Sequence, residues 1–87
     1  MKIKEGFLLR EVAGTSIVVA TGQRTKEFNG IIKLNETGVF LWKNMMKPTD
    51  METLTNALTE EYEVSKDKAA EDVENFVKTL KSADIIE

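Results

Sequence analysis

The fold of this chain is decided by residues 28–38, which read FNGIIKLNETG. The first part belongs to an apolar run over Glu27–Leu34 that predicts a β-strand. Asn35 predicts the N-cap of a helix, because its side chain can accept a hydrogen bond from a backbone N–H of the first turn. Glu36 in that turn suits the positive end of the helix dipole. Gly38 costs the helix about 1 kcal/mol relative to alanine, so we expect another element to pack closely there.

Two more strands are predicted upstream of this stretch. They span Phe7–Val12 and Ser16–Thr21, and the residues Ala13-Gly14-Thr15 between them are typical of a turn. Three such runs joined by short glycine-containing links predict an antiparallel meander, in which the third strand lies at an edge. Gly30 inside that third strand predicts a bulge or a close backbone approach.

Three helices are predicted downstream. The first covers about Glu36–Met46, and the second spans Asp50–Tyr62 and opens with a capping box over residues 49–52. The third spans Lys66–Ala83, with Ser65 as its N-cap and with apolar residues that recur at the helical period. A three-stranded antiparallel sheet followed by three helices is an α+β fold with a winged-helix-like layout.

The strands carry large aliphatic side chains on both faces of the predicted sheet. An antiparallel sheet with one solvated face alternates apolar and polar residues, whereas here Phe7 points to one face and Leu8 and Val12 point to the other. Either the third helix or the termini cover the second face, or a partner does. The third strand also has no charge or proline between Phe28 and Ile32, and such an unprotected edge is a template for strand addition.

Composition limits the chemistry that is available to the chain. Its 87 residues include 12 basic and 15 acidic ones, a net charge of −3, and neither cysteine nor histidine is present. Thiolate ligands, the commonest metal ligand and the usual general base are therefore missing. An enzyme would need a carboxylate pair, such as Asp72 with Glu71 or Glu74, near a hydroxyl, and no spacing suggests one. We therefore expect a single non-catalytic domain over residues 1–87 that needs no metal and no cofactor.

Charge and hydropathy also bear on partners and location. No apolar run reaches the roughly 18–20 residues of a membrane span, and the first residues lack the apolar core of a signal peptide, so we expect none. We therefore expect a cytoplasmic protein with no membrane partner. A DNA-binding winged helix needs a basic recognition helix, but the charges of the predicted third helix balance to zero. We expect no nucleic-acid partner, and a winged-helix DNA-binding protein and a structural interaction subunit stay as alternative functions.

The motif that joins the third strand to the first helix resembles the PqqD-like family, which takes its name from the coenzyme PQQ synthesis protein D. It comprises Leu34-Asn35-Glu36-Thr37-Gly38, followed by Leu41-Trp42. The upstream run Leu8-Leu9-Arg10-Glu11-Val12-Ala13-Gly14 also fits, and the resemblance covers nearly the whole chain. One departure is Asp84, where members of the family often have glycine. The resemblance implies a three-stranded sheet packed on three helices.

The resemblance also implies a function. Proteins of this family act as chaperones that bind the leader segment of a ribosomally made precursor peptide and present it to a modifying enzyme. That enzyme is a radical SAM enzyme or another maturase, such as a cyclodehydratase or a leader peptidase. The peptide adds as a strand beside the third strand and lies in a groove against the third helix. By position, the implied peptide-binding residues of this chain are Lys26, Glu27, Phe28, Asn29, Gly30, Ile31, Ile32, Lys33, Val73, Phe76, Val77 and Leu80.

The first part of the chain predicts the charge of such a leader. Residues 1–34 carry six basic and three acidic side chains, a charge of +3, and Arg24, Lys26 and Lys33 lie near the predicted edge. Complementary charge speeds association and selects partners, so we expect acidic residues among the apolar anchors of the leader.

Overall fold

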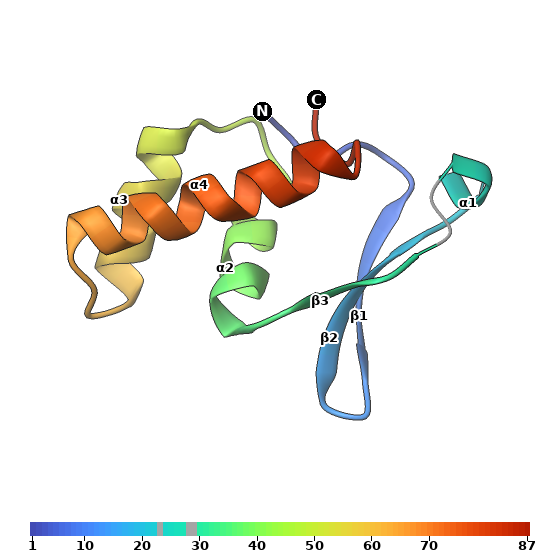
Figure 1. The fold of residues 1–87 in the computed structure, drawn as a ribbon, viewed down its shortest axis with the longest axis horizontal. Coiled ribbons are helices and arrows are strands. Elements are labelled where there is room, and N and C mark those ends of the chain that lie inside the picture. The colour runs from blue at the N-terminus through green and yellow to red at the C-terminus, as the bar shows by residue number, and fades with distance from the viewer. Residues whose placement is uncertain (23, 28–29) are drawn as a thin grey trace.

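A three-stranded antiparallel sheet and a helical half lie side by side in this computed structural model, which describes residues 1–22, 24–27 and 30–87 (Figure 1). The strands follow the order β1-β2-β3, so the predicted sheet, with its third strand at an edge, is confirmed. The elements are, in chain order, β1 (Phe7–Val12), β2 (Thr15–Ala20), α1 (Arg24–Glu27), β3 (Ile32–Leu34), α2 (Glu36–Asn44), α3 (Met51–Glu61) and α4 (Lys66–Ser82).

The hairpin of β1 and β2 closes through a two-residue turn. Val12 pairs with Thr15, and φ is positive at both residues between them, 51° at Ala13 and 79° at Gly14. Two positive φ values in succession are typical of a type I′ turn, whose twist matches that of the flanking strands. Gly14 adopts this backbone without the steric penalty that a Cβ brings. The turn predicted at this point is confirmed.

β3 is shorter than the sequence predicts. The strand was expected over Glu27–Leu34, and among the described residues β3 covers Ile32–Leu34, whereas Glu27 is the last residue of the short helix α1. The chain turns here because Thr25 bonds the carbonyl oxygen of Gly22 twice, through its N–H at 3.2 Å and its hydroxyl at 2.7 Å. Local hydrogen bonds of this kind compete with an extended strand. Thr25 is β-branched and lies close to an apolar run, so its residue type did not predict the turn.

The bulge or close approach predicted at Gly30 is wrong. This residue lies before β3, and a Cβ at its position would meet no heavy atom within 4 Å. Its neighbours Phe28 and Asn29, which were expected within the strand, lie outside the described residues.

Two of the predicted helix caps are confirmed. The side chain of Asn35 accepts a hydrogen bond from the N–H of Gly38 at 2.8 Å and starts α2 directly after β3. The hydroxyl of Ser65 accepts one from the N–H of Lys68 at 3.1 Å and starts α4. Both caps satisfy a backbone donor that has no partner within its helix.

The capping box predicted over residues 49–52 is wrong in its register. Asp50, rather than Thr49, caps α3, and its carboxylate accepts a hydrogen bond from the N–H of Thr53 at 2.7 Å. An aspartate is at least as good an N-cap as a threonine, and its charge also suits the helix dipole, so the helix starts one residue later.

The core fills the space between the inner face of the sheet and the helices. Phe7 and Val18 reach it from the sheet, and Trp42 of α2 is 3% exposed. The C-terminal end returns to the start of the chain, where Ile86 forms an antiparallel bridge with Ile3. No helix among the described residues is long and apolar enough to cross a membrane. The buried hydrophobic residues are Ile3, Phe7, Val18, Leu41, Trp42, Met45, Leu54, Leu58, Ala69, Val73, Val77, Leu80, Ile85 and Ile86.

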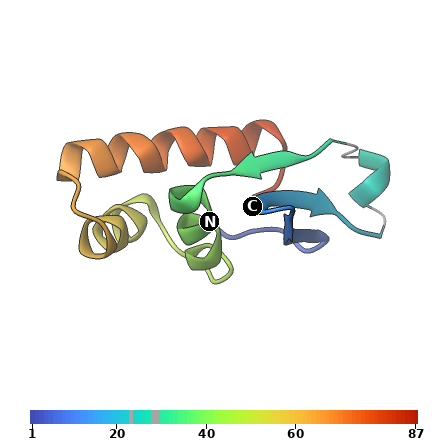
Figure 2. The same ribbon diagram turned by 90° about the horizontal axis from the view of Figure 1, so that it is seen from below.

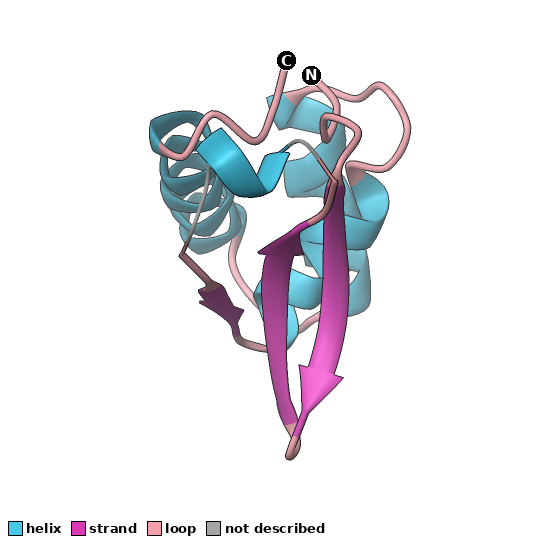
Figure 3. Ribbon diagram, turned by 90° about the vertical axis from the view of Figure 1, so that its right-hand side faces the viewer, coloured by secondary structure: helices cyan, strands magenta, loops and turns pink. Residues whose placement is uncertain are grey.

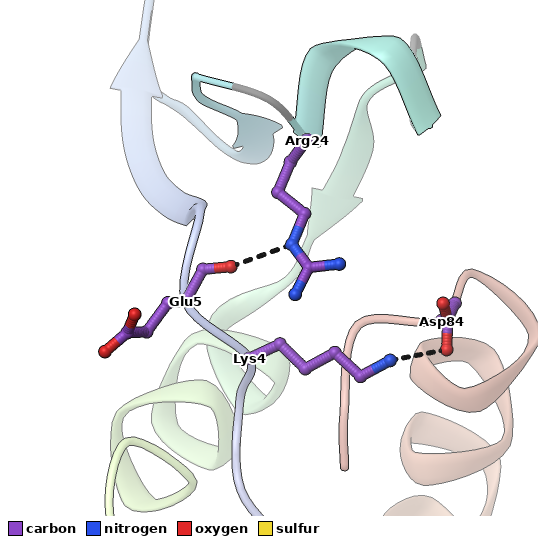
Figure 4. A network of polar contacts seen from close by, with 4 residues as sticks. All are labelled: Lys4, Glu5, Arg24 and Asp84. Atoms are coloured by element: carbon purple, nitrogen blue, oxygen red, sulfur yellow. Dashed lines mark hydrogen bonds and ion pairs between the residues drawn. The ribbon is translucent and has the colours of Figure 1, made fainter.

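Polar contacts tie the first residues to the C-terminal turn and to α1 (Figure 4). The ammonium of Lys4 lies 2.6 Å from the carboxylate of Asp84, and Arg24 donates a hydrogen bond to the carbonyl oxygen of Glu5 at 3.0 Å. The hydrogen bond from Lys4 holds the pKa of Asp84 below its ordinary value of 3.8. Asp84 has a φ of 58°, a left-handed conformation that aspartate tolerates and glycine prefers.

We expect the Lys4–Asp84 ion pair to make stability depend on pH. In an Asp84→Gly variant the backbone keeps its positive φ without strain, so the ion pair alone is lost. Because the pKa of Asp84 is lower in the folded than in the unfolded chain, the pair stabilises the fold fully above about pH 5 and ceases to do so as the pH falls through the folded-state pKa. Urea unfolding of both proteins should show a stability gap that closes in acid, and a gap of constant size would contradict this role.

Candidate functional site

The backbone of β3 is paired with β2 along one side, and its other side is an open edge of the sheet. The N–H of Thr21 bonds the carbonyl oxygen of Gly6 at 2.8 Å, just beyond the pair Phe7–Ala20. Hydrogen bonding alternates along an antiparallel ladder. The backbone N–H and carbonyl groups of Thr15, Ile17 and Val19 therefore point toward β1, and those of Ser16 and Val18 point toward β3. The partners of Ser16 and Val18 are Leu34 and Ile32, so the backbone groups of Lys33, between them, point to the open edge.

A groove runs beside this edge, between β3 and α4. One part, about 500 Å³, lies against Phe76 and Thr79 of α4, and a second part, about 410 Å³, continues along that helix. Both parts share Gly38 as well as these two residues, so they form one groove, called the α4 groove below. Figure 2 shows β3 between α4 and the hairpin, which places the open edge of the sheet toward this helix. The groove is lined by Ile32, Lys33, Leu34, Asn35, Thr37, Gly38, Leu41, Lys68, Asp72, Asn75, Phe76 and Thr79.

Gly38 lies where three elements come together. A Cβ at this position would lie 3.3 Å from the Cβ of Leu34 in β3 and 3.4 Å from Cε1 of Phe76 in α4. It would also lie 3.2 Å from the capping oxygen of Asn35. The close approach predicted at Gly38 is therefore confirmed, and the missing side chain leaves the α4 groove open at this point.

The face of α4 that lines the groove is not the one proposed from the sequence. Val73 and Leu80 are 0% exposed and Val77 is 5% exposed, so these three side chains belong to the core, and none of them lines the α4 groove. Val77 also borders a different hollow, beside Met1 and Met51. Of the four helix residues proposed from the sequence, Phe76 alone lines the α4 groove.

The groove face of α4 consists of a neighbouring stripe. Its members recur at intervals of four, three, one and three residues, which places them on one side of the helix. Sequence reasoning missed most of them, because their polar side chains resemble an ordinary solvated face. The stripe comprises Lys68, Asp72, Asn75, Phe76 and Thr79.

The charges on this stripe are balanced within it. The ammonium of Lys68 lies 3.1 Å from the carboxylate of Asp72, one helical turn along. The hydrogen bond to Asp72 raises the pKa of Lys68 above its ordinary value of 10.5, so the Lys68 ammonium keeps its charge at neutral pH. The far end of the groove therefore carries no net charge.

The residues proposed on the strand side occupy several kinds of structure. Ile32 and Lys33 lie in β3, Lys26 and Glu27 in α1, and Gly30 and Ile31 precede β3 as exposed residues. Phe28 and Asn29 lie outside the described residues. Of the eight residues 26–33 proposed from the sequence, Ile32 and Lys33 are therefore the ones that the structure places in the edge strand.

The cations near the edge are not equivalent. Lys26 and Lys33 are exposed. Arg24, by contrast, bonds the carbonyl oxygen of Glu5 and lies 5.7 Å from the ring centroid of Phe7, a distance typical of a cation–π contact. Arg24 therefore has a structural role, and Lys33 is the exposed cation that lies in β3 itself.

Two other features of the described residues bear on the site. Another hollow, about 640 Å³, lies between the hairpin tip, α2 and Tyr62 and does not include Ile32 or Lys33 of the open edge. Within the parts of the chain that the structure describes, no cluster of three or more acidic, histidine or cysteine side chains could hold a metal ion.

Comparison with known proteins gives two matches. The family model described as Coenzyme PQQ synthesis protein D (PqqD) matches residues 8–86. The solved structure "TbiB1 in Complex with the TbiA(beta) Leader Peptide" matches with a TM-score of 0.77 and 17% sequence identity. That match covers 100% of this chain and 95% of the TbiB1 chain, so the two share a fold. No curated protein sequence matches the chain significantly.

Proposed function

This chain belongs to the family of coenzyme PQQ synthesis protein D, and we propose that it binds the leader segment of a ribosomally made precursor peptide and presents it to the enzyme that modifies that peptide. The observation that carries the proposal is the open edge of β3 beside the α4 groove. Family membership supports it, and so does the fold shared with TbiB1, whose structure contains a leader peptide.

The geometry fits strand addition. A peptide that extends the sheet beyond β3 would pair with the N–H and carbonyl groups of Lys33, and such main-chain bonds provide affinity with little demand on sequence. Its alternate side chains would enter the α4 groove between Leu34 and Phe76. Apolar side chains at that spacing would then act as anchors and supply specificity.

The charge of the site predicts the composition of the leader, and the entropy lost on binding limits its affinity. Lys33 is an exposed cation of the edge strand itself, and Lys26 is an exposed cation in the preceding helix α1, so acidic residues between the anchors would favour association. A disordered leader loses conformational entropy when it is ordered, and the dissociation constant should therefore be on the order of micromolar.

We propose that residues 1–87 act as one peptide-recognition domain, which catalyses nothing itself and works in the cytoplasm. The domain would deliver the bound precursor peptide to a second protein, which carries out the chemical modification. We propose that this partner is a radical SAM enzyme or another maturase.

The test is a titration of a fluorescein-labelled leader peptide, taken from a short reading frame beside the gene, with Phe76→Ala and Val77→Ala variants. We expect Phe76→Ala to weaken leader binding roughly 5- to 30-fold, because it removes an apolar wall of the groove. Val77→Ala should leave affinity within about twofold but lower the free energy of unfolding by about 2 kcal/mol, because Val77 is buried in the core. Equal binding by wild type and Phe76→Ala would argue against the α4 groove as the peptide site.

A further inference from the structure

The outer face of the sheet, which is turned away from the core, exposes a group of aliphatic side chains. Side chains alternate along a strand, so Leu8 and Val12 of β1 lie on this face together with Ile17 and Val19 of β2. Leu8 is 45% exposed, Val12 is 55% exposed, and Ile31 just before β3 is 59% exposed. Figure 3 shows α2, α3 and α4 behind the strands, so none of these helices covers this face.

The charged residues of this face are cations. Arg10 pairs with Ile17, and Ile17 pairs in turn with Lys33, so one row across the sheet reads cation, aliphatic, cation. The single acidic residue of the three strands, Glu11, alternates onto the opposite face. A solvated sheet face ordinarily carries mainly polar side chains, and an exposed apolar patch bordered by charge is typical of an interaction surface.

We propose that this outer sheet face docks the peptide-modifying enzyme, through a surface of the enzyme that has an apolar centre and acidic side chains around it. This inference rests on the function proposed above. A second copy packed face to face and centred on this row would place the Arg10 and Lys33 side chains of the two copies close together, and such like-charge contacts are unfavourable. An acidic partner surface complements both charges.

The position of the face supports this choice of partner. Lys33 presents its side chain on the outer face and its backbone groups to the open edge, so the two surfaces meet at this residue. A peptide added at the edge would continue the sheet, and an enzyme docked on the outer face would lie directly beside it. The α4 groove on the inner side would stay accessible to the anchors of the peptide.

The test uses a Leu8→Thr/Val12→Thr double variant and an Arg10→Glu variant of the full chain. All three residues lie in β1, which is separated from β3 by β2, and their side chains are on the outer face. Threonine has a high β-propensity, so the strand should be retained. The probes are a purified candidate modifying enzyme, taken from the genes that flank this one and immobilised for surface plasmon resonance, and the labelled leader peptide. We expect both variants to bind the leader within about twofold of wild type and to bind the enzyme at least about tenfold more weakly. Arg10→Glu should act mainly by slowing association.

A matched control removes the same kind of side chain from the helical side. Met46 and Met51 are 51% and 39% exposed, so a Met46→Thr/Met51→Thr variant loses comparable exposed apolar surface away from the sheet. It should bind both probes as wild type does. A control that loses enzyme binding as strongly as the sheet variants would overturn the assignment to the outer face.

Other outcomes separate this inference from the proposed function. Wild type that binds the leader but not the enzyme, or sheet variants that bind the enzyme at full strength, would overturn the docking inference alone. A concentration-dependent dimer in sedimentation that the Leu8→Thr/Val12→Thr variant abolishes would assign the face to a second copy. Binding to phosphatidylglycerol vesicles that the same variant abolishes would assign it to a lipid surface. Wild type that binds no leader would overturn the proposed function, and the docking inference with it.

Discussion

Proline at Lys33 should abolish most leader binding while the domain remains folded. The backbone groups of Lys33 point to the open edge, so its N–H has no role in the pairing of β3 with β2. Proline removes that donor and places its ring where the added strand must approach. The peptide carbonyl left without a donor adds to the lost hydrogen bond, and together they should cost about 2–3 kcal/mol of binding free energy, a 30- to 150-fold rise in Kd.

Proline one residue earlier should do the opposite. Ile32 pairs with Val18 and faces β2, so Ile32→Pro removes a bond of the ladder that holds β3 in place. We expect this variant to lose about 2–3 kcal/mol of unfolding free energy. Thermal unfolding followed by circular dichroism measures the fold, and fluorescence anisotropy of the labelled leader measures binding.

Lys33→Ala is the matched control for the proline variant. It removes the same side-chain charge but keeps the backbone N–H, so it should bind the leader only a few times more weakly than wild type, and less so at high salt. If the folded Lys33→Pro variant binds the leader as tightly as Lys33→Ala does, strand addition at this edge is wrong.

The sheet and its edge could be predicted because their signals are local. The Ala13-Gly14 turn and the β-branched residues of Thr15–Ala20 specify the hairpin, and a meander places its last strand at an edge. The cap at Asn35 likewise needs only the residues of one helical turn. Which backbone groups of β3 face outward needs the register between strands, and that information comes from the bond between Thr21 and Gly6.

The groove face of α4 could not be predicted because it depends on tertiary packing. Apolar periodicity identifies the core stripe with Val73 and Leu80, but it does not tell which flank of that stripe lies toward β3. The groove flank carries Asn75 and Thr79, whose residue types are those of a solvated surface. Gly38 was the available signal: it indicated that another element comes close to α2, although the sequence could not identify that element as Phe76 of α4.

A graded series at Gly38 should close the α4 groove step by step. In Gly38→Ala, the gain of about 1 kcal/mol in helix propensity is offset by contacts of 3.2–3.4 Å with Asn35, Leu34 and Phe76. Stability should therefore change by less than about 1 kcal/mol, while leader affinity falls several-fold because Phe76 is pushed into the groove. In Gly38→Leu, the larger side chain fills the space of a peptide anchor, whose burial contributes about 1.5–3 kcal/mol, so affinity should fall roughly 100-fold.

The control for this series places the same side chain elsewhere on the same helix. Lys43 is exposed in the last turn of α2 and does not line the α4 groove, so Lys43→Leu should bind the leader as wild type does. Overpacking at Gly38 should cost the leucine variant about 1–3 kcal/mol of stability, so circular dichroism must accompany each titration. The alanine variant avoids most of that cost and keeps the test decisive. If affinity were the same for glycine, alanine and leucine in folded protein, the peptide would not occupy the space between Leu34 and Phe76 that Gly38 leaves open.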